Sequence, residues 1–228
     1  MTEIIQQLNE IDTQIFLFFN GCHNSYWDGF MYMFTNAKTW IPLYISFLYV
    51  MIRNYPPKVI LTTLAAIGLL VLLCDQTASG LLKPLVGRLR PSNEDNPLSP
   101  MVHIVQGYRG GRYGFPSSHA SNTWGISLFA IYLVRRRLLT CLLLAWTILT
   151  CYTRMYLGVH YFGDILVGSL IGIIYATVVY LLYRRYLPKY AEAYSPTHPI
   201  AYGYLPLIIG LATVAALLCA SGIMLGMN

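Results

Sequence analysis

The chain has 228 residues, of which 56% are hydrophobic and only 11% are charged, and this composition excludes an ordinary soluble domain. The formal net charge of +6 does not indicate a nucleic-acid partner, because the basic residues are divided among several membrane loops and do not gather on one soluble face. The five cysteines form no CxxC pair and have no spacing typical of a metal site.

The first 28 residues are predicted to form an amphipathic helix in the membrane interface. No Lys or Arg precedes Lys38. A signal peptide needs a positive n-region, so this segment is expected to stay on the protein. Apolar residues recur here at helical spacing, at Ile4, Leu8, Ile11, Ile15 and Phe18. This pattern fits an interfacial helix and equally a helix packed on the bundle, and the sequence leaves both open.

Six apolar segments follow, each a candidate for a transmembrane helix. A bilayer core about 30 Å thick needs about 20 apolar residues per helix. The predicted spans are 30–52, 59–80, 120–134, 138–156, 164–183 and 204–226, of which the third is short. We therefore expect an all-α fold, a polytopic helix bundle forming a single domain over residues 1–228. Its active-site segments are expected at 83–119 and 153–164, between the spans.

The first of these polar segments contains the sequence KPLVGRLRP. Lys83 and Arg90 are seven residues apart, so a helix would place both on one face, with Gly87 leaving a gap between them and Arg88 pointing away. Pro91 is expected to end this helix. A single cation at a helix end usually extends to lipid headgroups. Two cations on one face favour an anion site.

A second sequence, GRYGFPSSHAS, directly precedes the third predicted span. Pro116 suits the first helical position, so Ser117 and Ser118 would present free backbone N–H groups at a helix N-terminus. Such a terminus attracts an oxyanion, although ordinary capping by serine explains the same pattern. His119 lies close enough to transfer a proton.

The third sequence, TRMYLGVHYFGD, joins the fourth and fifth spans. His160 and Asp164 are four residues apart, so on a helix the carboxylate would accept a hydrogen bond from one ring nitrogen. The other nitrogen would then face an electrophile, which is the arrangement of an activated nucleophile. Arg154, at the end of the fourth span, adds a cation.

Together the three segments resemble the signature of the type 2 phosphatidic acid phosphatase superfamily, which also includes vanadium haloperoxidases. The family pattern is Lys-x6-Arg-Pro, then Pro-Ser-Gly-His, then Ser-Arg-x5-His-x3-Asp. The matching residues are Lys83, Arg90, Pro91, Pro116, Ser117, His119, Arg154, His160 and Asp164. Ser118 replaces the usual Gly and Thr153 the usual Ser. The resemblance covers about residues 30–180. Within the superfamily, the sequence is similar to the bacterial membrane lipid phosphatase branch.

The resemblance implies a metal-independent phosphatase with no cofactor. His160 would attack phosphorus, His119 would protonate the leaving group and later activate water, and Asp164 would orient His160. The phosphate oxygens would be held by Lys83, Arg90, Ser117, Ser118 and Arg154. A zinc site formed by the two histidines and Asp164 is the competing interpretation, and the three nearby cations count against it.

Charged loops indicate the orientation of the chain. Lys and Arg in short loops tend to remain cytoplasmic, but the two faces carry similar numbers. One face has Arg53, Lys58, Arg135, Arg136, Arg137, Arg184, Arg185 and Lys189, and the other has Lys83, Arg88, Arg90, Arg109, Arg112 and Arg154. If the second set binds substrate, the triple arginine becomes the orienting signal. We then expect the site and both termini to face the periplasm from a bacterial inner membrane.

The substrate is expected to be a lipid phosphate at the bilayer surface. An envelope lipid, a polyprenyl diphosphate or a lipid A phosphate, is favoured because Arg109 and Arg112 could contact a second phosphate or a sugar. Phosphatidic acid and phosphatidylglycerophosphate are alternatives. A transporter is a remote alternative, because transporters place charges at mid-membrane. The oligomeric state is left open.

Overall fold

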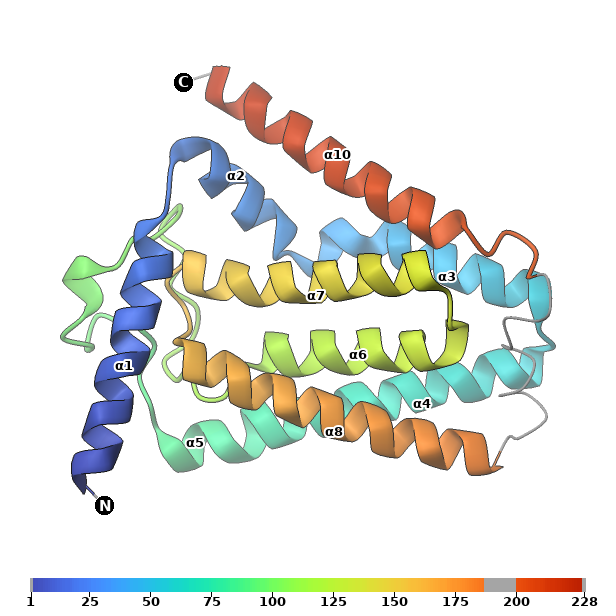
Figure 1. Ribbon diagram of the computed structural model, residues 1–228, viewed down its shortest axis with the longest axis horizontal. Coiled ribbons are helices and arrows are strands. Elements are labelled where there is room, and N and C mark those ends of the chain that lie inside the picture. The colour runs from blue at the N-terminus through green and yellow to red at the C-terminus, as the bar shows by residue number, and fades with distance from the viewer. Residues whose placement is uncertain (1, 187–199, 227–228) are drawn as a thin grey trace.

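The protein is an elongated helix bundle with one helix lying across its end (Figure 1). The computed structural model describes residues 2–186 and 200–226, and within them extended pairing is limited to an isolated bridge between Leu89 and Tyr113. The helices are α1 (Thr2–Gly21), α2 (Ser25–Phe34), η1 (Ala37–Trp40), α3 (Ile41–Asn54), α4 (Pro57–Asp75), η2 (Gln76–Leu82), α5 (Lys83–Val86), η3 (Ser99–Met101), α6 (Ser118–Val134), α7 (Arg137–Tyr156), α8 (Phe162–Tyr186) and α10 (Leu205–Gly226). The predicted all-α membrane fold is confirmed.

Among the residues that the structure describes, four helical stretches are long and apolar enough to cross a bilayer. They are the continuous run Pro57–Val86, then Arg137–Tyr156, Phe162–Tyr186 and Leu205–Ile223. α3 has 14 residues and α6 has 17, which at about 1.5 Å per residue gives lengths of about 21 and 26 Å. The predicted count of six spans is therefore not confirmed.

The first predicted span, 30–52, is broken in two. α2 ends at Phe34, and the side chain of Asn36 accepts a hydrogen bond from the Lys38 amide, which starts the short helix η1. Pro42 then occupies the first turn of α3, where its missing N–H costs nothing. These local caps override the continuous apolar pattern.

The closest helix pair is α6 and α8. Gly168 and Gly172 of α8 lie against α6, and a Cβ atom on either would lie 2.3 Å from a backbone oxygen, that of Ser117 or Ser121. Small residues at these positions let the two backbones approach. The first turns of the two helices, which carry Ser118 and Asp164, are thereby brought together.

The two ends of the bundle differ in their charges. The helix ends at Asn54, Val134 and Tyr186 gather at the right of Figure 1, with Arg53, Lys58, Arg135, Arg136, Arg137, Arg184 and Arg185 near them. Lys189 lies outside the described residues. The opposite end holds the loops 87–117 and 157–161, together with both chain termini.

Helix α1 lies across this second end (Figure 1). Phe16 is fully buried, and the Asn20 side chain donates to the carbonyls of His103, Met155 and Tyr156 at 2.9–3.2 Å. The apolar residues Ile4, Leu8, Ile11 and Phe18 are 53–67% exposed. One face of α1 therefore packs on the bundle, and the other remains available for the interfacial position that the sequence predicts.

Candidate active site

His160 and Asp164 form the buried centre of the site, at the junction between the α7–α8 loop and the first turn of α8. His160 Nδ1 lies 3.2 Å from Asp164 Oδ2, which also accepts the Tyr161 amide at 3.1 Å. The two side chains are 1% and 0% exposed. The contact expected from their spacing is present, although His160 lies before the helix starts at Phe162.

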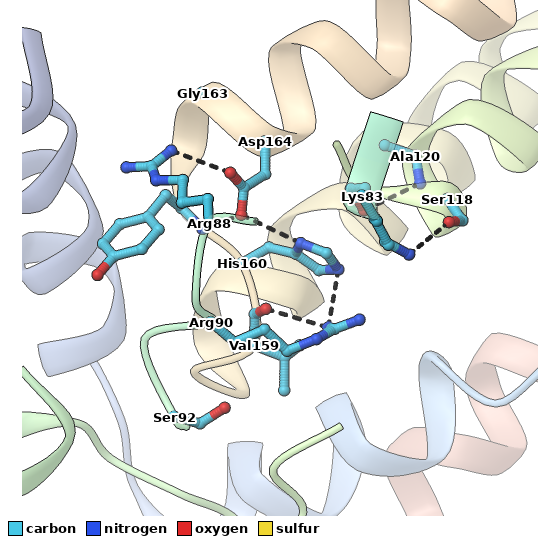
Figure 2. A network of polar contacts seen from close by, with 12 residues as sticks. Lys83, Arg88, Arg90, Ser92, Ser118, Ala120, Val159, His160, Gly163 and Asp164 are labelled. Carbon is cyan, nitrogen blue, oxygen red and sulfur yellow. Dashed lines mark hydrogen bonds and ion pairs between the residues drawn. The ribbon is translucent and has the colours of Figure 1, made fainter. Parts of the chain in front are cut away.

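The second ring nitrogen of His160 faces a guanidinium. Arg90 Nη1 lies 3.0 Å from His160 Nε2 and donates to the Val159 carbonyl at 3.1 Å (Figure 2). Burial, followed by the charges of Arg90, Arg154 and Lys83, holds the pKa of His160 well below its usual value. The imidazole is therefore neutral at pH 7, and its Nε2 lone pair is free of a proton.

The segment from Lys83 to Arg90 differs from the expected helix. The helix ends at Val86, because Gly87 adopts the left-handed conformation (φ +64°) and caps it by donating to the Lys83 carbonyl at 2.9 Å. Beyond Gly87 the chain is extended, and the Arg90 amide donates to Arg112. The prediction of a helix up to Pro91 is wrong.

Arg88 is also placed differently from the expectation that it points away. Its Nη1 donates to Asp164 Oδ1 at 2.9 Å, and its Nη2 pairs with Asp12 Oδ2 at 2.7 Å. The guanidinium lies 3.9 Å from the centroid of the Tyr161 ring. Once the helix has ended at Gly87, the extended backbone turns Arg88 towards Asp164.

Lys83 and the start of α6 form the second side of the site. Lys83 Nζ donates to Ser118 Oγ at 2.7 Å, and Ser79, four residues before Lys83, lies 2.7 Å from the same hydroxyl. Figure 2 shows Lys83 and Ser118 beside the His160 ring. His119 follows Ser118 in the first turn of α6, and its side chain is exposed.

Ser117 has a structural position that the sequence analysis did not foresee. It is the N-cap of α6, so Pro116 precedes the cap and does not occupy the first helical position. The Ser117 amide donates to the Asp164 carbonyl at 2.9 Å, and its hydroxyl accepts the Ala120 amide at 3.4 Å. Both groups of Ser117 therefore have partners within the protein, and the expectation of a free Ser117 N–H is wrong.

Arg154 is buried beneath the site with 1% exposure. It donates to the hydroxyls of Thr35 at 2.7 Å and Tyr108 at 3.1 Å. Its charge lowers the pKa of His119 and contributes to lowering the pKa of His160. The expected cations and histidines are thus brought into one electrostatic environment.

The cations around His160 lack acidic partners. In the described part of the chain, none of Lys83, Arg90 and Arg154 has a carboxylate oxygen within 4 Å. The Nε groups of Arg90 and Arg154 are buried without a hydrogen-bond partner. Burial and the Arg154 charge lower the pKa of Arg90 to about 10, which leaves it charged at neutral pH. Such an uncompensated cluster is built to receive an anion.

Four residues of the site were missed by the sequence analysis. They are Asp12, Thr35, Ser79 and Tyr108. Ser79 is one helical turn before Lys83, so its spacing could have identified it. The others make contacts that span tens of residues or more, such as the 119 residues between Thr35 and Arg154. No local pattern marks contacts of that kind.

Comparison with known proteins identifies the family of this chain. A model of the PAP2 superfamily matches residues 56–188. The chain belongs to the PAP2 superfamily. The resemblance seen in the three motifs is confirmed, and the predicted class, a membrane lipid phosphatase, is confirmed with it.

Two curated relatives of this PAP2 protein are named lipid A 4'-phosphatase. One, from Bacteroides thetaiotaomicron, is 48% identical over 169 residues, covering 74% of this chain and 75% of the relative. The other, from Porphyromonas gingivalis, is 34% identical over 197 residues, covering 86% and 83%.

Two solved PAP2 structures share the fold. Aquifex aeolicus LpxE has a TM-score of 0.55 at 24% identity, covering 73% of this chain and 93% of its own. A transmembrane PAP2-type phosphatidylglycerolphosphate phosphatase from Bacillus subtilis has a TM-score of 0.59 at 21% identity, covering 78% and 87%.

Proposed function

We propose that this protein removes the 4'-phosphate of lipid A at the periplasmic surface of a bacterial inner membrane. The observation that carries the proposal is a cluster of three cations around the neutral His160. Arg90 and Arg154 are buried, Lys83 is half-buried, and among the described residues none of the three has a carboxylate oxygen within 4 Å. An oxyanion bound there would neutralise the cluster. The choice of lipid A rests on the two relatives, 48% and 34% identical, that carry this name.

The proposed reaction has two steps. His160 Nε2 attacks phosphorus, the P–O bond to the lipid breaks, and His119 gives its proton to the departing oxygen. His119 then takes a proton from water, whose oxygen attacks the phosphohistidine. The N–P bond breaks, inorganic phosphate leaves, and His160 is regenerated. Asp164 orients the imidazole through Nδ1 and stabilises the charge that develops on it.

The phosphate oxygens are assigned to the cations and to the start of α6. Lys83, Arg90, Arg154 and the Ser118 hydroxyl surround the reacting position. Ser117 contributes by capping α6, since its own groups have partners. No metal enters this mechanism, because the three side-chain cations supply the electrostatic stabilisation. The proposed mechanism therefore differs from the alternative in which the two histidines and Asp164 bind zinc.

The orientation is supported by the unequal ends of the bundle. At the site end, Arg88 is paired with Asp12 and Asp164, and Arg109 pairs with Glu94 at 3.4 Å. The remaining site-end cations belong to the phosphate cluster or the nearby loop. The opposite end carries seven described Lys and Arg residues at the helix ends and in the turn between α6 and α7, the pattern expected for a cytoplasmic face.

Arg109 and Arg112 differ in their availability to a lipid headgroup. Arg109 donates to the Ser92 carbonyl at 2.6 Å and to the Ser99 hydroxyl at 3.1 Å, which commits it to the loop. Arg112 is 64% exposed and lies 3.5 Å from Asp95. Arg112 is therefore the better candidate for contacting a sugar or a second phosphate.

A substrate panel tests the proposal. The purified full-length protein is assayed for phosphate release from lipid A, undecaprenyl diphosphate, phosphatidic acid and phosphatidylglycerophosphate, with His160→Ala as the control. We expect the highest kcat/KM with lipid A, and mass spectrometry should show loss of the 4'-phosphate. A higher kcat/KM with either glycerophospholipid would favour the alternative, and loss of a different lipid A phosphate would refute the assigned position.

A further inference from the structure

One carboxylate of α1 reaches the active site. Asp12 Oδ1 accepts the Gly163 amide at 2.8 Å, and Asp12 Oδ2 pairs with Arg88 Nη2 at 2.7 Å. Gly163 belongs to the first turn of α8, next to Asp164. The two contacts span 151 and 76 residues of sequence, so the fold alone creates them.

Arg88 divides its guanidinium between two carboxylates. One nitrogen pairs with Asp12 and the other with Asp164 Oδ1 at 2.9 Å, while the plane lies 3.9 Å from the Tyr161 ring centroid. Figure 2 shows Arg88 on the side of Asp164 away from His160. A planar fork held by two acids and an aromatic ring has little freedom to rotate.

Asp164 is consequently held through both of its oxygens. Oδ1 accepts from Arg88, and Oδ2 accepts from the Tyr161 amide and faces His160 Nδ1. Asp164 is completely buried, so its charge needs this cation nearby. The direction of the carboxylate sets the direction of the imidazole ring.

We infer that Asp12 and Arg88 are positioning residues for the phosphatase reaction: Asp12 holds the Arg88 fork on Asp164, and Asp164 in turn aims His160. The inference rests on the catalytic roles proposed above for His160 and Asp164. It gives α1 a function beyond anchoring, because the helix that lies across the end of the bundle completes the support of the nucleophile. Neither residue touches the phosphate.

A purely structural role for Asp12 makes different predictions. Asp12 also accepts a hydrogen bond at the N-terminus of α8, where a carboxylate stabilises the helix. If this were its whole function, Asp12→Asn would lower the melting temperature, but the folded enzyme would retain its kcat.

The test uses Asp12→Asn in the full-length enzyme, purified in detergent, with lipid A and an activated aryl phosphate as substrates. We expect kcat to fall about tenfold on both and KM to change less than about twofold, since a supporting contact orients the reacting group without binding substrate. Asp12→Glu should recover part of the loss. Glu10→Gln is the matched control, because Glu10 is an exposed acid of the same helix that accepts a hydrogen bond from the Gln6 side chain at 3.4 Å.

A double-mutant cycle separates positioning from stability. If Asp12 acts through Asp164, Asp12→Asn should cost almost nothing in an Asp164→Asn background, whereas independent effects would multiply. Multiplicative losses overturn the inference. Should Asp12→Asn fail to fold, Arg88→Lys replaces it in the same cycle, because an ammonium keeps the charge but cannot bridge both acids in this geometry.

The outcomes distinguish this inference from the proposed function. If Asp164→Asn is impaired while Asp12→Asn and Arg88→Lys both turn over at the wild-type rate, the positioning role is wrong and the phosphatase mechanism stands. If Asp164→Asn itself retains full activity, the proposed mechanism is wrong and the positioning role is overturned with it.

Discussion

The two histidines of the site occupy different surroundings. His160 is buried against Asp164, whereas the His119 side chain is exposed. We expect His160→Ala to lose several orders of magnitude in single-turnover phosphate release on every substrate, because the proposed covalent step needs the Nε2 atom of this ring. His119→Ala should lose about 10²–10⁴-fold on a lipid phosphate but far less on a nitrophenyl phosphate, whose phenolate departs without a proton.

Asp164→Asn should fall between these two variants, because the imidazole remains while its orientation is weakened. Each variant must first be shown to be folded in detergent. Substantial activity of His160→Ala, or an equal loss by His119→Ala on both leaving groups, would falsify the assigned roles.

The charge of His119 should depend on the occupant of the site. The charge of Arg154 lowers the pKa of His119 in the free enzyme, so this imidazole is neutral at pH 7. A bound oxyanion offsets the cations and raises that pKa, so binding should take up a proton and tighten as pH falls. Calorimetric titration with vanadate, in two buffers of different ionisation enthalpy, measures the uptake. His119→Gln should abolish it, and an unchanged uptake in that variant would contradict the prediction.

Removal of divalent metals tests whether the side-chain cations are sufficient for activity without a metal ion. Lys83, Arg90 and Arg154 are proposed to supply the stabilisation that a metal gives in other phosphatases. Activity should therefore survive excess chelator. Activity that disappears in chelator and returns with one divalent ion would show that the side chains are insufficient.

At the level of helices, the contact between α6 and α8 sets the width of the site. A Cβ on Gly172 would lie 2.3 Å from the Ser121 carbonyl oxygen, so Gly172→Ala should push the helices apart and destabilise the protein by about 1–3 kcal/mol. Activity should fall as well, since Ser118 and Asp164 begin these helices. Thermal unfolding and turnover are measured together. Gly68→Ala, where a Cβ meets nothing within 4 Å, should leave both unchanged, and equal effects at the two positions would refute the packing argument.

Helices and motifs differ in how far they could be predicted from sequence. The strongly apolar stretches around α4, α7, α8 and α10 were predicted because bilayer thickness dictates their length. The span at 30–52 was misjudged because the Asn36 side chain and Pro42 act locally within an apolar run. Arg88 was misplaced because Gly87 was interpreted as a gap in a helix when it ends the helix.

In the site, contacts within one short segment were predicted from the sequence, and contacts between distant segments were not. The spacing of His160 and Asp164 predicted their contact because both lie on one short segment. The partners of Arg154 and the reach of Asp12 depend on helices that meet only in the folded chain. Sequence patterns therefore predicted the groups that are proposed to react and missed the residues that hold them.

For the whole molecule, the two ends of the bundle make a topological prediction. In a cysteine-free background, a thiol reagent that cannot cross the inner membrane should label Asp95→Cys in the site-end loop of intact cells. Leu138→Cys, beside the arginines of the opposite end, should react only after permeabilisation. The reverse pattern would place the site on the cytoplasmic face and leave its chemistry unchanged.

The cations without acidic partners set stability against activity when the sequence changes. Arg90 and Arg154 repel each other in a buried pocket, and Lys83 adds to that repulsion. With the site as proposed, the resting enzyme carries a free-energy cost that a bound anion relieves, so the proposed substrate site also lowers the stability of the fold. Substitutions that neutralise these residues are the ones most able to gain stability while losing function. A selection for stability alone would accordingly enrich inactive variants. Substitutions that increase tolerance to detergent and heat while keeping activity should therefore lie far from the proposed phosphate site.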